Sequence, residues 1–171
     1  MESSNVKLYS LSLRDVRTYA FAALFIVGNI VFPQLCHALI SKGGLIFLPI
    51  YFFTLIGAYK YGAKVGLLTA LLSPIINSAF FGMPPVAALP MIVMKGVLLA
   101  CAASVIANRT KSVSIFAILA VVLMYQVVGC GIEWAVKGSF MAGVQDFRLG
   151  VPGMLIQVIG GWAFIKFILK K

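Results

Sequence analysis

Residues 65–94 read VGLLTALLSPIINSAFFGMPPVAALPMIVM, an uncharged stretch of 30 residues. One helix across a bilayer needs about 20 apolar residues, so the stretch is too long for a single membrane helix. Its centre holds Gly82-Met83-Pro84-Pro85, and Gly and Pro are the residues that most strongly interrupt helices. The stretch therefore predicts two membrane helices, 65–81 and 85–107, joined by a turn.

Further apolar runs of membrane-spanning length lie on both sides of this pair, separated by polar or basic segments. We expect one domain, residues 1–171, that is a compact all-α integral membrane bundle of six transmembrane helices. We also expect residues 137–148 to form a polar loop. The expected spans are 18–40, 44–59, 65–81, 85–107, 112–136 and 149–169.

The composition excludes most soluble classes of protein. Of the 171 residues, 62% are hydrophobic and 11% are charged, and the mean hydropathy is +1.07. Soluble domains are about 45–50% apolar and about 25% charged. The 13 Phe residues exclude a disordered chain, because disordered chains are poor in aromatic residues. The first apolar run is too long for the core of a signal peptide, so we expect a transmembrane helix there.

The net charge of +10 indicates membrane orientation rather than nucleic-acid binding. Six spans place both termini on one side of the membrane. Ten Lys and Arg residues fall on that side, and three, Lys42, Lys137 and Arg148, fall on the other. Cytoplasmic loops carry an excess of Lys and Arg. We therefore expect both termini in the cytoplasm.

Lys95 and Glu133 are the two residues that qualify firmly as intramembrane ionisable groups, which are costly and usually functional. Helix side chains lean toward the N-terminus of their helix, and these two helices run in opposite directions, so the side chains could converge in the outer half of the bundle. One interpretation is a buried ion pair that fixes packing. A second is a substrate site, and a third is Lys95 bonded to backbone carbonyls freed by Pro90.

Further polar and aromatic candidates recur at helical spacing. Tyr125, Gln126, Gly129 and Glu133 fall on one face of the fifth span, and Gln157 lies among glycines of the sixth. Small residues allow close helix packing, so Gln157 is either an interhelical bridge or lines the same cavity as Gln126.

Three other side chains have an open role. His37 lies at the outer end of the first span, where it either makes an interfacial hydrogen bond or contacts a substrate. Trp134 adjoins Glu133 and is either an interfacial anchor or a stacking surface for a ligand. Asn77 and Ser73 lie one turn apart, which favours hydrogen bonds between helices.

No nucleophile–base–acid arrangement and no phosphate-binding glycine loop occur in the sequence, so we expect no enzyme activity and no cofactor. A single His excludes a multi-His metal site, and we expect no metal. Cys36, Cys101 and Cys130 all fall within expected spans and lack metal-ligand spacing, which favours packing roles.

Four segments carry a resemblance to a known family. They are 44–51 (GLIFLPIY), 61–68 (YGAKVGLL), 73–78 (SPIINS) and 81–85 (FGMPP). Their order, a second span, a basic glycine turn, a third span and a Gly-Met-Pro turn, resembles the S components of energy-coupling factor transporters. The resemblance covers residues 18–107 by motif and the rest of the chain by topology.

The resemblance implies a prokaryotic inner-membrane protein that binds a vitamin or related micronutrient with high affinity. Such a protein hands its ligand to a T subunit and two cytoplasmic ATPase subunits. By position, the resemblance places His37, Lys42, Lys95, Glu133 and Trp134 near the ligand. It also implies docking of the T subunit through small residues of the first helix, here Thr18, Ala22 and Ala23, although a strict Ala-x-x-x-Ala pair is missing.

Two other functions compete with this one. A small secondary transporter or channel would work without an ATPase, and a scaffold or assembly protein would bind a protein partner and no small ligand. The residues leave the identity of the micronutrient open.

Overall fold

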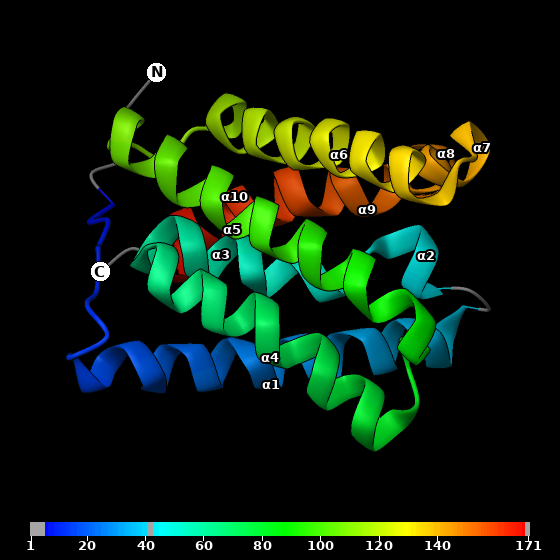
Figure 1. Cartoon of the computed structure of the whole chain (residues 1–171). Helices are drawn as coiled ribbons and strands as arrows, with labels where there is room; N and C mark the ends of the chain where they lie inside the picture. The colour runs from blue at the N-terminus through cyan, green and yellow to red at the C-terminus, as the bar shows by residue number, and fades with distance from the viewer. Residues whose placement is uncertain (1–5, 41–42, 170–171) are drawn as a thin grey trace.

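The computed structural model of the chain describes residues 6–40 and 43–169, and within these ranges every regular element is helical. Figure 1 shows the helices packed side by side along one long axis. Five helices are long and apolar enough to cross a membrane, as expected for a multi-pass membrane protein. They span Val16–Leu39, Ala63–Phe81, Val86–Thr110, Ile115–Lys137 and Val151–Ile168. The all-α expectation is confirmed for the described residues.

The expected span 44–59 is not one helix. It consists of α2 (Gly43–Phe47), the 3-10 turn η1 (Pro49–Tyr51) and α3 (Phe52–Tyr61). Leu48 adopts a left-handed conformation with φ of 46°, and Pro49 lacks the N–H group that would continue the α2 helix. Nearly all of α3 is buried against α1 (Val16–Leu39), α4 (Ala63–Phe81) and α5 (Leu89–Thr110). This pass is therefore part of the core of the bundle.

The long helices begin and end at identifiable residues. The Asp15 carboxylate accepts a hydrogen bond from the backbone of Arg17 and caps α1, and Ser114 caps α6 (Ile115–Lys137) in the same way. The turn between α3 and α4 needs Gly62, which has φ of 97° and would bring a Cβ within 3.2 Å of the Tyr9 carbonyl oxygen. At the basic glycine turn, the backbone of Gly62 therefore packs closely against the N-terminal segment around Tyr9.

The expected loop 137–148 is also partly helical, and this part of the prediction is wrong. It contains α7 (Phe140–Gly143) and α8 (Gln145–Leu149), which lead directly into the last helical pass. That pass consists of α9 (Val151–Leu155), the π-helical turn η3 (Ile156–Gly160), α10 (Gly161–Ala163) and η4 (Phe164–Ile168). The consequence is that Asp146 is held on a helical turn rather than in a free loop.

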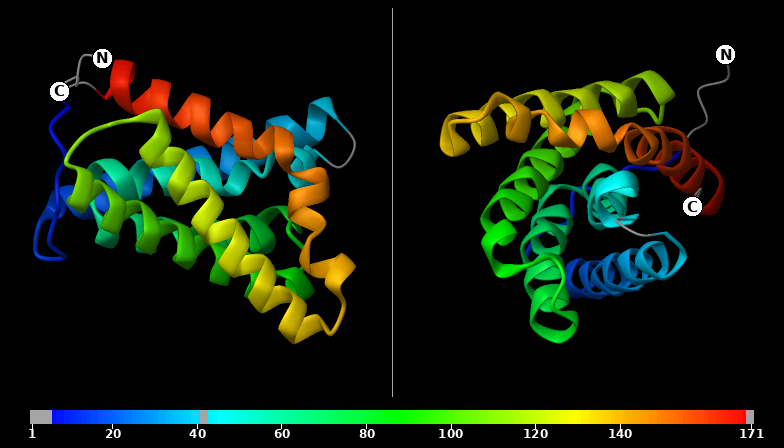
Figure 2. Two further views of the ribbon diagram at one scale, coloured as in Figure 1. Left: turned by 90° about the horizontal axis from the view of Figure 1, so that it is seen from above. Right: turned by 90° about the vertical axis from the view of Figure 1, so that its right-hand side faces the viewer.

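The two ends of the bundle differ in what they carry. At one end, Tyr9 and Leu11 donate backbone hydrogen bonds to the carbonyls of Lys60 and Tyr61 at the end of α3. The last turn, η4, ends beside this N-terminal segment, as the two views of Figure 2 show. The other end carries α2, α7, α8 and the turn between α4 and α5 (Figure 1).

Hydrogen bonds between polar groups inside the bundle account for the burial of Asn77. Pro33 lies within α1 and has no N–H to donate to the carbonyl of Asn29, four residues before it. The Asn77 amide donates to that carbonyl across α1 and α4, at 2.9 Å. The Asn29 side chain in turn accepts from the backbone N–H of Phe53, one of the first donors of α3, at 3.1 Å. Asn77 therefore serves interhelical hydrogen bonding, one of the roles that the sequence favoured.

We expect Asn77→Ala to lower the free energy of unfolding by about 1–2 kcal/mol, because the Asn29 carbonyl loses its donor in an apolar interior. In a Pro33→Ala background the loss should shrink, since an alanine at position 33 restores the N–H for that carbonyl. Unfolding in mixed micelles, measured as a double-mutant cycle, gives the coupling. Gln34→Ala removes only the contact of Gln34 with Asn77 and should show no such coupling to residue 33. Equal losses from Asn77→Ala in both backgrounds would contradict this account.

Two of the three residues expected on the docking face of the first helix are buried in this structure. Thr18 is buried and donates its hydroxyl to the Ser12 carbonyl at 2.6 Å. Ala22 is buried in the core, so neither residue lies on the surface of this structure. Ala23 is exposed. The spacing of small residues on α1 is explained by packing inside this chain.

Candidate functional site

A buried ionic cluster lies at the end of the bundle that carries α7 and α8. The Lys95 ammonium of α5 is 2.5 Å from a Glu133 oxygen of α6 and 2.6 Å from an Asp146 oxygen of α8. The other Glu133 oxygen pairs with Lys137, one turn further along α6, at 2.5 Å. The side chains of Lys95, Glu133 and Asp146 are 2%, 9% and 15% exposed, whereas that of Lys137 is 44% exposed. The cluster thus joins α5, α6 and α8.

The neighbouring backbone leaves room for the long Lys95 side chain. A Cβ at Gly129 of α6 would lie 2.9 Å from the Lys95 Cγ, so a glycine there lets the lysine stem pack against the helix. Asp146 lies in the first turn of α8, and α8 begins directly after Val144, the residue that caps the end of α7. The two short helices therefore place Asp146, which lies outside the long helices, in contact with Lys95.

The cluster agrees with the ion-pair interpretation of Lys95 and Glu133. Lys95 makes no hydrogen bond to a carbonyl near Pro90 within the described residues. Asp146 was missed by sequence reasoning, because it falls in a segment that looked like a loop. A signal was available, since the chain has only four acidic residues. Two positive and two negative side chains leave the cluster with no net formal charge.

The amide and phenol groups nearby have different surroundings. Tyr125 is buried and donates its hydroxyl to the Gln157 side chain at 3.0 Å, and Gln157 donates at 3.5 Å to the Leu48 carbonyl. Gln157 is therefore the interhelical bridge that the sequence left as one alternative. Gln126 is fully buried, and its amide has no hydrogen-bond partner among the described residues. Its position one turn before Gly129 places it deeper along α6 than the cluster.

A separate pocket of about 420 Å³ opens at the same end of the bundle. It lies between the end of α1, the α2–η1 segment and the turn that leads from α4 through η2 (Val86–Ala88) into α5. Its size is within the range of small-molecule sites. The lining residues are Pro33, His37, Gly44, Leu45, Pro49, Ile50, Met83, Pro84, Pro85, Ala88 and Ile92.

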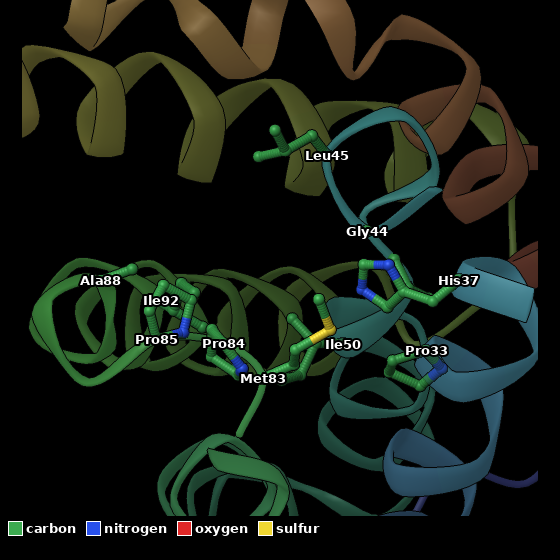
Figure 3. A pocket seen from close by; sticks show the side chains of 11 residues that line it. Pro33, His37, Gly44, Leu45, Ile50, Met83, Pro84, Pro85, Ala88 and Ile92 are labelled. Atoms are coloured by element: carbon green, nitrogen blue, oxygen red, sulfur yellow. The ribbon is translucent and has the colours of Figure 1, made fainter. Parts of the chain in front are cut away.

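His37 is the one polar side chain among these lining residues. Figure 3 shows its ring reaching from α1 into the pocket beside Gly44. A Cβ at Gly44 would lie 2.7 Å from the His37 Nε2 atom, so the ring occupies space that only a glycine leaves free. The ring makes no hydrogen bond to any described residue, which leaves its nitrogens available in the pocket.

The structure divides the expected site residues between several places. Ile92 lines the pocket, and Lys95 follows one turn later on α5, so the pocket and the ionic cluster are neighbours along that helix. Lys95 and Glu133 are not among the lining residues. Trp134 is 52% exposed, packs edge-on against Phe140 of α7 and is not among the residues that line the pocket. Lys42, placed near the ligand by the resemblance, lies outside the described residues.

The pocket and the cluster differ in the chemical groups that they present. Among residues 6–40 and 43–169, no group of three or more His, Cys, Asp or Glu side chains could hold a metal ion. The pocket offers apolar surface and one imidazole, and the cluster offers paired charges. Neither places a nucleophile next to a free base.

No protein-family model, curated protein or solved structure matches the chain in the comparisons made.

Proposed function

We propose that the chain is the substrate-binding membrane subunit of an uptake system for a vitamin or related micronutrient. It spans the prokaryotic cytoplasmic membrane six times, the broken second pass included, with both termini in the cytoplasm. It binds its ligand at the outer end of the bundle and hands it to an energy-coupling module of a T subunit and two ATPases. The resemblance of residues 18–107 to S components supports this role.

The observation that carries the proposal is the pocket at the end of the bundle that carries α2, α7 and α8. Eight described Lys and Arg residues lie at the opposite end or in segments leading to it, whereas Lys137 and Arg148 lie at the pocket end. Basic residues mark the cytoplasmic side of a membrane protein, so the pocket faces outward. A pocket that opens outward suits capture of a solute from outside the cell.

The buried ionic cluster favours a second candidate function. Intramembrane ionisable residues are typical of ion-coupled carriers, so a secondary transporter could use Lys95, Glu133 and Asp146 to couple uptake to protons. In the structure, however, the members of the cluster pair with one another and none lines the pocket. We therefore place binding and delivery first.

Mass spectrometry of the compound released on denaturing the purified chain tests the proposal. We expect one small molecule at close to equimolar amount, because a high-affinity binder retains its ligand through purification. Uptake of that molecule should require an active ATPase module, and a module whose ATPase is inactive is the control. Uptake driven by a proton gradient without the module would establish the secondary transporter instead. Absence of any bound or transported compound would contradict both functions.

A further inference from the structure

We propose that the ligand of this pocket is an uncharged, mainly apolar molecule that forms one hydrogen bond with His37. This inference rests on the proposed function and narrows its substrate class. It differs from one alternative of the sequence analysis, in which Lys95 and Glu133 form the substrate site.

Among the residues that the structure describes, those lining the pocket include no charged side chain. A charge taken out of water without a partner costs several kcal/mol, so an ionised ligand would need a counter-charge in the wall. Four of the lining residues are prolines, and the others apart from His37 are aliphatic residues, methionine and glycine. Such a wall favours a ligand whose contact surface is mostly hydrocarbon or aromatic.

The charged side chains of the described ionic cluster already pair with one another. Lys95 is held between two carboxylates, and Lys137 shares Glu133 with it, so the described cluster has no unpaired member. Arg148 is exposed on α8 and is not among the lining residues. A charged ligand would have to break a buried ion pair to obtain a partner, which an uncharged ligand avoids.

The position of His37 explains how an apolar pocket could select one molecule. An imidazole both donates and accepts hydrogen bonds, and the His37 ring has no partner among the described residues. Gly44 keeps the space that the ring occupies, because a Cβ there would lie 2.7 Å from Nε2. A ligand group that pairs with this ring gains orientation, whereas a molecule without such a group gains only apolar contact.

A set of three probes with the same ring tests the charge of the ligand. Radiolabelled indole, indole-3-carboxylate and tryptamine are measured at equilibrium against the purified full-length chain in detergent. We expect saturable binding of indole and at least tenfold weaker binding of both charged analogues. His37→Phe should weaken indole binding about three- to tenfold, the effect of one hydrogen bond. Equal or tighter binding of either charged analogue would overturn the inference.

A pair of substitutions in the turn η2 locates the binding. Ala88 lines the pocket, whereas its neighbour Ala87 is exposed and does not. Ala88→Phe should abolish saturable indole binding and Ala87→Phe should leave it unchanged. Indole binding that survives Ala88→Phe, or its absence from the unaltered chain, would contradict the inference.

The compound released from the purified chain separates failure of this inference from failure of the proposed function. An uncharged small molecule that Ala88→Phe removes and Ala87→Phe retains supports both. A charged small molecule with the same dependence leaves the proposed function standing and overturns the inference. Phospholipid alone, removed by Ala88→Phe, would mean that an acyl chain fills the pocket, and both would fail.

Discussion

Replacing Lys95 with methionine is expected to lower the free energy of unfolding by about 3–5 kcal/mol, the typical effect of removing one partner of a buried ion pair. Methionine matches the lysine stem as far as Cε, so the packing of the stem against Gly129 is preserved while the ammonium is lost. Glu133 keeps Lys137, but Asp146 loses the one cation that contacts it among the described residues. Reversible unfolding in mixed detergent micelles measures the effect.

Two comparisons make the Lys95 experiment specific to charge. Lys137→Met removes a cation that is 44% exposed, and surface ion pairs contribute about 0–1 kcal/mol, so its effect should be small. The triple change Lys95→Met, Glu133→Gln and Asp146→Asn removes the uncompensated charges and should recover most of the lost stability. If the triple variant is as unstable as Lys95→Met, the loss comes from packing and not from the cluster.

The same variants bear on the role of the cluster in function. If the ligand is uncharged and lies in the pocket, the triple variant should still bind indole, because none of its changed residues lines the pocket. Loss of binding in a triple variant that remains folded would instead make Lys95, Glu133 or Asp146 a ligand contact. Stability and binding together therefore distinguish a packing device from a site.

The ionic cluster shows where sequence reasoning succeeds and where it stops. Hydropathy locates Lys95 and Glu133 within spans, and helix direction makes their convergence one expected outcome. Asp146 required knowledge that residues 140–149 fold into two short helices, each too short to give a periodic pattern. Trp134 was grouped with Glu133 by adjacency, but neighbouring helical residues point about 100° apart, and here one is buried and the other exposed.

Other features depend on contacts between distant segments. Asn29 looks ordinary in the first span, yet its carbonyl needs a donor because of Pro33, and Asn77 supplies it from another helix. The break at Leu48 and Pro49 was visible as a proline, but an apolar run of span length concealed it. The burial of α3 follows from its packing among three helices, which composition alone does not reveal.

Because α3 lies at the centre of the bundle, we expect Gly66→Val to cause a severe loss of stability. Gly66 of α4 faces α3 so closely that a Cβ there would lie 2.4 Å from the Ala58 Cβ and 2.8 Å from its Cα. On its other side the same Cβ would lie 3.1 Å from the Ala100 Cβ of α5. Relief requires movement of a helix backbone, so we expect a loss of about 3 kcal/mol or more, at the upper end of overpacking effects.

Gly131→Val is the matched control, since a Cβ at Gly131 of α6 meets no atom within 4 Å. Both changes replace a helical glycine with valine, so the intrinsic helix propensity cancels between them. Unfolding in mixed micelles should therefore show a near-neutral Gly131→Val and a strongly destabilised Gly66→Val. Similar values for the two variants would mean that α3 does not contact α4 at this distance. Because α3 continues from η1, whose Pro49 and Ile50 line the pocket, weak α3 packing would also leave that wall without support.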